Sequence, residues 1–274
     1  MSGRARVEAR IATLGELGEI LGSMKTLAAV EARTLARLQT HQAGVSAVID
    51  TASRAFWQHY GGTLLPDAGT PVTLAVGSER GFVGDFNRRV AAAVPAGAPC
   101  LTVGRRLPGR LPAGVPMVGA LDGPVVADEV EPVLTATLAA FARFIEGLGP
   151  PRITAVYQVP GGVGVRHRQI FPPSPEPPAV HGAGNPPLLN LSPGDFLREL
   201  LDYHLTAALR DVVLSSLTAE NEQRTQHLDV AVRRLDERRA ALRRRGQALR
   251  QEEITEEIEV ILLGETALAP LHRE

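Results

Sequence analysis

The sequence predicts an α/β protein: a long antiparallel two-helix coiled coil, formed by the N- and C-termini, together with a central Rossmann-like α/β domain. The 21 prolines all avoid residues 1–65 and 194–269, so both of these segments can be helical throughout. Between them, short apolar runs alternate with helical patterns, as in a parallel α/β sheet. We therefore expect an N-terminal shaft helix (1–65), a central α/β domain (66–193) and a C-terminal shaft helix (194–274).

The N-terminal segment, about 4–58, is patterned as an amphipathic helix with steps of three, four and seven between apolar residues. These residues are Val7, Ile11, Leu14, Leu17, Leu21, Met24, Leu27, Leu35 and Leu38. Gly15, Gly18 and Gly22 interrupt the pattern on one face, at a cost of about 1 kcal/mol each relative to alanine. They indicate either a weak spot or bend, or the close approach of another helix, and the pattern favours neither.

The C-terminal segment, about 194–263, is expected to be a helix that starts at the signal Ser192-Pro193-Gly194-Asp195. A strict seven-residue repeat follows, and it predicts a left-handed supercoil with a partner helix. The repeat is made by Leu228, Leu235, Leu242 and Leu249, and is followed by Ile254, Ile258 and Ile261. The alternate positions are Val232, Arg239, Gly246 and Glu253. Because three of these four are not apolar, we expect a narrow seam with one helix, and the N-terminal helix is the economical partner.

The middle of the chain is predicted to contain strands at 72–76, 100–103 and 115–118, helices at 88–94 and 130–148, a strand at 153–158 and an edge strand at 163–171. Eight prolines fall in the 22 residues from 172 to 193, which predicts an exposed, stiff loop.

No motif in the sequence predicts catalysis, a cofactor or a metal. Gly81-x-x-Gly84 follows a strand but lacks the third glycine of a dinucleotide site, so a glycine turn is favoured. Gly18 to Thr26 resembles a phosphate loop with the wrong spacing, inside a helical pattern. The seven histidines have no metal-ligand spacing, and the single cysteine, Cys100, excludes an internal disulfide and suits a reducing compartment. The first residues are charged rather than signal-like, and no run of about 18 apolar residues could span a membrane.

Charge is segregated along the C-terminal helix. Residues 223–251 hold nine arginines and three acids, whereas residues 252–259 hold five acids and no base. A solvated helix with intrahelical ion pairs is one interpretation. The degree of segregation favours the other, a basic collar that binds an acidic protein or nucleic acid. The net charge of −1 argues against a surface built as a whole for nucleic acid.

Four stretches together resemble the gamma subunit of F-type ATP synthases, the rotating central stalk. They are RIA at 10–12 with ILGSMKTLAA at 20–29, SERGFVGDFN at 78–87, LTAENEQR at 217–224, and RQEEITEEIE at 250–259 with Gly264. Their order and spacing match the family along nearly the whole chain. Departures occur at Leu21-Gly22, Val83-Gly84-Asp85, Gln247-Ala248-Leu249 and the Pro-rich stretch 172–187. These departures indicate a divergent bacterial member, and the alternative sodium-linked synthases are one interpretation; the coupling ion, proton or sodium, stays open.

The resemblance implies a rotor subunit without catalytic activity of its own, because the nucleotide sites of these complexes belong to the alpha and beta subunits. It implies a shaft inside the alpha–beta ring, a base that contacts epsilon and the c-subunit ring, no cofactor, no nucleic-acid partner, and a peripheral position on the cytoplasmic face of the bacterial plasma membrane. The family positions that match this sequence place partner contacts at Met24, Lys25, Arg224, Arg250, Gln251 and Thr255. The alternative function is a coiled-coil adaptor that binds an acidic partner or nucleic acid through its Arg-rich C-terminal helix.

Overall fold

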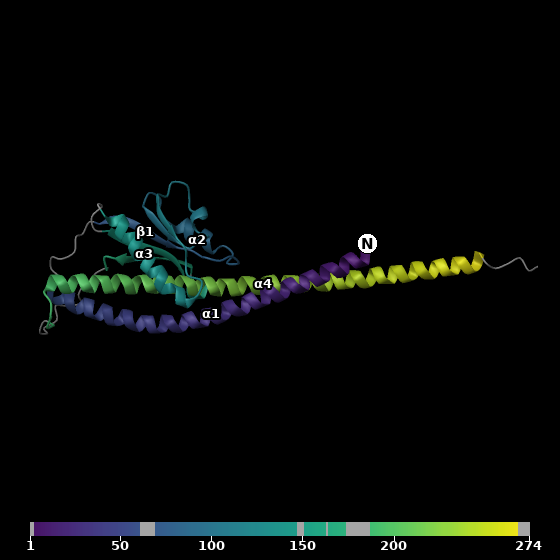
Figure 1. The fold of residues 1–274 in the computed structure, drawn as a ribbon, viewed down its shortest axis with the longest axis horizontal. Coiled ribbons are helices and arrows are strands. Elements are labelled where there is room, and N and C mark those ends of the chain that lie inside the picture. Colours follow the sequence, from purple (N-terminus) through teal and green to yellow (C-terminus); the bar gives the residue numbers. More distant parts are fainter. Residues whose placement is uncertain (1–2, 61–68, 147–150, 163, 174–186, 268–274) are drawn as a thin grey trace, which may run out of the picture. The chain divides into compact units, whose positions relative to one another are not determined.

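The computed structural model describes residues 3–60, 69–146, 151–162, 164–173 and 187–267 (Figure 1). The chain forms two compact units: Met1–Thr26 with Leu228–Glu274, called here the coil unit, and Leu27–His227, called here the domain unit. Two long helices, α1 (Gly3–Tyr60) and α4 (Pro193–Ala267), contribute to both units. The predicted start of the C-terminal helix at Pro193 is confirmed.

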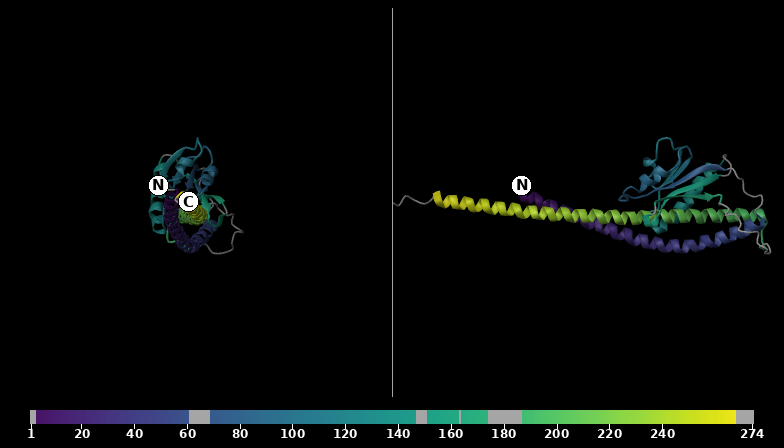
Figure 2. Two further views of the ribbon diagram at one scale, coloured as in Figure 1. Left: turned by 90° about the vertical axis from the view of Figure 1, so that its right-hand side faces the viewer. Right: turned by 180° about the vertical axis from the view of Figure 1, so that it is seen from behind.

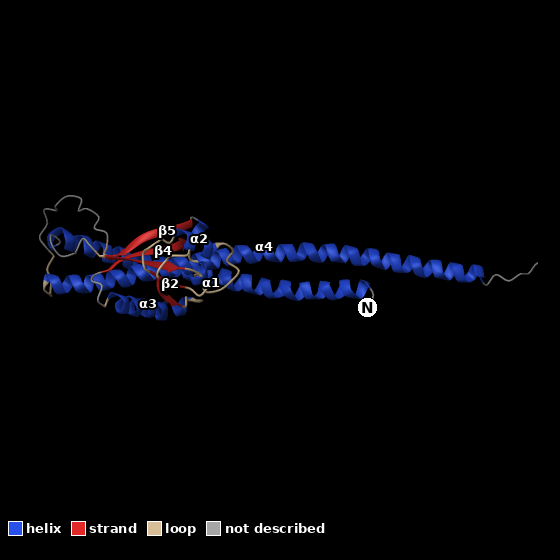
Figure 3. Ribbon diagram, turned by 90° about the horizontal axis from the view of Figure 1, so that it is seen from above, coloured by secondary structure: helices blue, strands red, loops and turns tan. Residues whose placement is uncertain are grey.

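Within the coil unit, α1 and α4 pair antiparallel, as the sequence predicts. A Cβ built on the backbone of Gly246 would lie 3.5 Å from the Val7 side chain. A Cβ built on Gly15 would lie 3.3 Å from the guanidinium of Arg239. Residue numbers thus fall along α4 as they rise along α1, and Figure 3 shows the two helices side by side. Every expected seam position of α4 is buried or half-buried: Leu228, Val232, Leu235, Arg239, Leu242, Gly246, Leu249 and Glu253.

The same spacing recurs on α1, where the buried and half-buried residues follow steps of three and four from Arg4 to Tyr60. A repeat of 3.5 residues along both helices gives left-handed supercoiling. The apolar stripe expected on α1 is wider than the buried stripe that the structure shows, however. Leu17, Leu27 and Leu38 are 44%, 69% and 39% exposed, because each lies one position before a buried or half-buried seam residue rather than in the seam.

The three glycines of α1 differ in their surroundings. Gly15 faces Arg239 across the seam, whereas a Cβ added to Gly18 or Gly22 would meet nothing within 4 Å. Helix α1 continues through all three positions. Close approach of the partner helix therefore explains Gly15 alone.

The domain unit contains a five-stranded sheet of order β3-β2-β1-β4-β5. Its elements are β1 (Thr70–Val76), α2 (Phe86–Ala93), β2 (Cys100–Val103), β3 (Met117–Leu121), α3 (Val130–Ile145), β4 (Pro151–Val159) and β5 (Gly164–Phe171). The first four strands in the order are parallel, and β5 is an antiparallel edge strand, as expected. The third strand, expected at 115–118, lies at 117–121. It is an edge strand with mostly exposed residues, so its sequence gives only a weak strand signal. Most of the Pro-rich loop, residues 174–186, lies outside the described residues.

Two apolar clusters cover the two faces of this sheet. On one face, Leu74 and Val76 pack with Leu134 of α3 and with Leu209 and Val213 of α4. The other face packs against α2 and the turn that precedes it. Segment 205–219 of α4 therefore runs along the sheet and forms part of the core of the domain (Figure 2). None of the described helices combines the length and apolar character needed to cross a membrane.

Candidate partner-contact surfaces

Five of the six residues expected at partner contacts lie in the coil unit, and Arg224 lies in the domain unit. On α1, Met24 and Lys25 are half-buried. The ammonium of Lys25 donates a hydrogen bond to the carboxylate of Asp229 on α4. This hydrogen bond, together with Arg233 at 2.5 Å, holds the pKa of Asp229 below its ordinary value although burial opposes the shift. The charge of Lys25 is therefore already matched within the chain.

Arg250, Gln251 and Thr255 are exposed near the end of α4. The Thr255 hydroxyl donates to the backbone carbonyl of Gln251 at 2.9 Å, so its proton is used inside the helix. The hydroxyl oxygen and the Gln251 amide remain on one helix face, where both can reach a partner.

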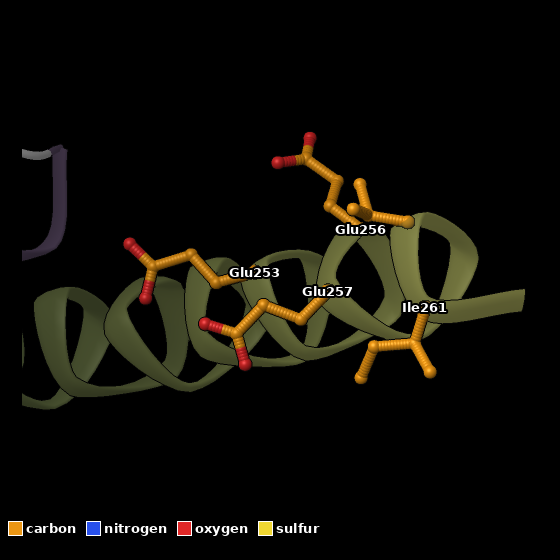
Figure 4. Close-up of a pocket in the computed structure, with 5 residues that line it drawn as sticks. Glu253, Glu256, Glu257 and Ile261 are labelled. Atoms are coloured by element: carbon orange, nitrogen blue, oxygen red, sulfur yellow. The ribbon is translucent and has the colours of Figure 1, made fainter. Parts of the chain in front are cut away.

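Beyond the seam, the last turns of α4 expose an apolar surface, called here the tip. The exposed fractions of Ile254, Ile258, Val260 and Ile261 are 46%, 50%, 69% and 62%. Glu253, Glu256 and Glu257 line a shallow groove with Val260 and Ile261 (Figure 4).

The sequence pattern suggests that these isoleucines continue the leucine repeat, but the structure shows that they do not lie in the seam. Gly3 of α1 lies opposite Leu249, and Arg4 reaches Glu253 at 3.8 Å. The described part of α1 therefore ends where the tip begins, which explains the exposure of its isoleucines.

Seven arginines between 233 and 250 are exposed on α4 and form what is called here the arginine surface. They are Arg233, Arg234, Arg238, Arg243, Arg244, Arg245 and Arg250. Among the described residues, the ion pairs of this stretch involve Arg233 with Asp229 and the half-buried Arg239 with Asp236. Intrahelical pairing thus accounts for a small part of the basic charge, which favours the interpretation as a partner surface.

Arg224 is the exception among the expected contact residues, because its side chain is only 7% exposed. Its guanidinium pairs with Glu220, donates to the Asn221 amide oxygen at 2.9 Å and donates to the Gly81 carbonyl at 3.2 Å. In this structure the residue therefore serves a contact inside the domain unit, between α4 and the turn after β1.

Glu220 completes this contact from the same helix face. Its carboxylate, 4% exposed, accepts hydrogen bonds from the backbone N–H groups of Glu79 and Arg80, each at 3.4 Å. Burial raises the pKa of the Glu220 carboxyl from its ordinary value, while the charge of Arg224 and the two N–H donors oppose that rise. The buried charge is thus paired and hydrogen-bonded, as buried charges must be.

The backbone of the rest of the turn is also tightly constrained. Gly84 has φ 59°, and a Cβ there would lie 1.9 Å from the His227 ring, so only glycine fits. Phe82 also has positive φ, 61°, although it is not glycine. Such backbone strain persists where surrounding contacts over-determine the conformation. The favoured interpretation of Gly81-x-x-Gly84 as a turn agrees with this geometry.

The turn occupies the place where open α/β sheets bind their ligands. That place lies outside the carboxyl ends of the strands, where the strand order reverses. Here β1 lies between β2 and β4, so the reversal falls at the end of β1. At this place the carboxylate of Glu220 accepts the hydrogen bonds of the Glu79 and Arg80 backbone N–H groups. Cys100 is buried, and burial raises the pKa of its thiol to about 11, so it is not a thiolate nucleophile at neutral pH.

In the α/β domain, the usual ligand position is filled by a side chain of the protein's own helix. The antiparallel coiled coil exposes apolar and basic surfaces. These features define a coiled-coil stalk protein that works through contacts with partners. A family model described as ATP synthase matches residues 4–268, so the chain belongs to this family. It is a gamma subunit, the non-catalytic central-stalk rotor subunit of an F-type ATP synthase.

Solved structures share this fold. A chain of the Euglena gracilis mitochondrial ATP synthase rotor has 13% sequence identity and a TM-score of 0.60, covering 92% of this chain and 98% of its own. A second Euglena gracilis chain, from the OSCP/F1/c-ring structure, has 12% identity and a TM-score of 0.63, with 99% and 98% covered. A chain of the Tetrahymena thermophila central stalk and c-ring has 12% identity and a TM-score of 0.51, with 77% and 99% covered. No curated protein sequence matches this chain significantly.

Proposed function

We propose that this chain is the rotor subunit of a bacterial F-type ATP synthase, where it couples ion flow through a membrane c-subunit ring to ATP synthesis or hydrolysis in an alpha–beta ring. The observation that carries this proposal is the exposed coil unit, with an apolar tip and an arginine surface on one helix of a gamma-family chain. Exposed apolar surface of this kind is typical of an interaction site.

The two surfaces of α4 suit two kinds of contact. The apolar tip fits an apolar collar formed by the ring, and the arginine surface fits acidic segments of the alpha and beta subunits, since complementary charge steers and orders such contacts. The domain unit would lie at the base, against epsilon and the c ring. The similar solved structures are a rotor, an assembly of OSCP, F1 and c-ring, and a central stalk with its c-ring, which supports this set of partners.

The mechanical demand on the chain follows from the energy of the ions. One charge that crosses about 150 mV supplies roughly 3.5 kcal/mol, so several ions must act together for each ATP. The rotor has to transmit the summed torque without unwinding. An asymmetric shaft would favour a different conformation of each beta subunit by making different contacts with each one.

Co-expression with the alpha and beta subunits of the same organism tests the proposal. We expect a stoichiometric complex whose ATP hydrolysis drives ion uptake into inverted membrane vesicles from the bacterial host, with this chain held peripherally on the cytoplasmic face. Stimulation of this hydrolysis by sodium would identify the sodium-linked type, and its absence the proton-linked type. Failure of the chain to join alpha and beta would contradict the proposal.

The adaptor function remains a second candidate because of the arginine surface. It predicts nucleic-acid binding whose affinity falls steeply with salt, without association with alpha or beta subunits. Titration of the full chain with duplex DNA and single-stranded RNA at two salt concentrations separates the two candidates.

A further inference from the structure

The contact between the β1 turn and α4 is made by a row of polar side chains, which apolar packing alone does not require. Residues Ser216, Glu220, Gln223, Arg224 and His227 lie at helical spacings of three, four and seven on one face of α4. Each of them meets the end of β1 or the turn that follows it. Five polar side chains on this face therefore meet the backbone of one short segment.

The contacts are made to backbone groups and so hold the position of the turn itself. Glu220 accepts from two N–H groups, Arg224 donates to the Gly81 carbonyl, and Gln223 donates to the Val83 carbonyl at 2.9 Å in the amide orientation that satisfies both of its neighbours. The bonds of Glu220 and Arg224 to the turn are long, at 3.2–3.4 Å, but both charged partners are buried, where the low dielectric strengthens such contacts.

A second carboxylate ties the same turn to the rest of the sheet. Glu79, whose side chain is 7% exposed, accepts from the backbone N–H groups of Arg105 at 2.9 Å and Gly123 at 2.8 Å. These two residues follow β2 and β3. The turn is thus held by the ends of the parallel strands on one side and by α4 on the other, so it adds a polar connection between α4 and the sheet to their apolar packing.

We propose that Glu220 and Arg224 form a clamp in which the carboxylate takes the place of a bound anion at the β1 turn, so that the α/β domain and the part of α4 inside the domain unit transmit torque as one body. Glu220 and Arg224 are then positioning residues for coupling. This inference rests on the proposed function, because it assigns the clamp a part in rotary coupling. Since α4 is continuous from Pro193 to Ala267, torque gripped at Glu220 passes along the helix itself.

Hydrogen exchange in the full-length chain tests the clamp without the complex. In Glu220→Gln, which keeps the shape but loses the charge, we expect the amides of Glu79 and Arg80 to exchange roughly tenfold to a hundredfold faster. The amide of Gly77, bonded to the Val103 carbonyl at 2.8 Å, should keep its rate. The exposed Glu199→Gln on the same helix is the matched control. Unchanged exchange at Glu79 and Arg80 would overturn the proposal.

Coupling in the assembled synthase tests the mechanical role. We expect Glu220→Gln to lower the number of ions pumped per ATP hydrolysed by half or more while hydrolysis itself continues. Arg224→Lys, which keeps the charge but lacks the planar fork, should act in the same direction. Faster amide exchange with an unchanged ratio of ions to ATP would mean that the contact is structural only, and would overturn the proposal.

Two features keep the outcome clear. If Glu220→Gln does not fold, Arg224→Lys and Gly84→Ala, whose new Cβ would displace His227, carry the same test. If the wild-type chain itself neither assembles nor pumps, the proposed rotor function fails, and the exchange experiment still decides whether the clamp exists.

Discussion

Lys25 of α1 donates a hydrogen bond to Asp229 of α4, and this pair joins the two antiparallel helices of the coil unit. The adjacent seam position is Leu228, which is fully buried. An ion pair and a buried leucine thus lie in neighbouring positions of one seam, and they should fail under different conditions.

The ion pair predicts a pH dependence of stability. Its hydrogen bond lowers the pKa of Asp229 in the folded chain. A lowered pKa contributes stability that is complete above the unfolded value, near 3.9, and is lost as pH falls through the folded value. We expect Asp229→Asn to lower the melting temperature at pH 7 and to have no effect at a pH below the folded value. Glu237→Gln, an exposed change nearby, should not show this pattern; an equal effect of Asp229→Asn at both pH values would argue against the ion pair.

The leucine repeat predicts a gradient of stability along the seam. Leu228 is 0% exposed, whereas Leu235 is half-buried. Leu228→Ala should therefore cost about 3 kcal/mol of unfolding free energy and Leu235→Ala about 1–2 kcal/mol. Urea denaturation of the full chain, followed by circular dichroism, measures both values. Equal costs would mean that the seam is not thinner at Leu235.

The glycines of α1 predict opposite outcomes for similar changes. Gly18→Ala and Gly22→Ala add a methyl group in open space and remove the helix penalty, so each should raise stability by about 0.5–1 kcal/mol. Gly84→Ala should instead lower stability by more than about 1 kcal/mol, because φ is positive and His227 blocks the new carbon. The three melting curves, compared with wild type, decide this.

We expect the removal of the Arg239 charge to raise the free energy of unfolding. It occupies a seam position opposite Gly15, and its Nε has no hydrogen-bond partner although it is buried. The guanidinium is half-buried and its ion pair with Asp236 is long, at 3.6 Å, and replacing such a pair with well-packed apolar side chains is often stabilising. Arg239→Met should raise the unfolding free energy by about 1 kcal/mol, and the exposed Arg238→Met should leave it within 0.5 kcal/mol of wild type. A loss of stability in Arg239→Met would show that the charge is matched in solution.

Much of the fold could be predicted because its signals are periodic. Proline-free segments and a seven-residue repeat fix α4 and its pairing, and the edge strand follows from an alternating pattern. The width of the α1 stripe could not be predicted, because Leu17 and Leu21 are equally apolar and only the supercoil separates exposed Leu17 from half-buried Leu21. A pattern on one helix does not show which of two adjacent stripes its partner covers.

The candidate sites divide in the same way. The resemblance selected the motifs that contain Glu220 and Arg224, but their contact with the turn joins residues about 140 positions apart in the chain. No local pattern encodes such a pairing, and Arg224 was therefore expected at a partner surface. The exposure of the tip could not be predicted, because its isoleucines continue the apolar pattern of α4 beyond the position opposite the first described residue of α1.

The exposed motif at the end of α4 predicts where the catalytic ring makes contact. Arg250 is exposed beside the seam, and Gln251 and Thr255 share a helix face four residues apart. Arginine offers a planar fork for carboxylates that lysine does not reproduce. Arg250→Ala and Arg250→Lys in the assembled complex should therefore both reduce ATP-driven ion pumping, about tenfold for alanine and less for lysine. Exposed Gln247→Ala on the same helix, outside both the motif and the arginine surface, is the matched control and should leave pumping within twofold of wild type. If Arg244→Ala impairs pumping while Arg250→Ala does not, the contact with the ring lies on the arginine surface away from the motif.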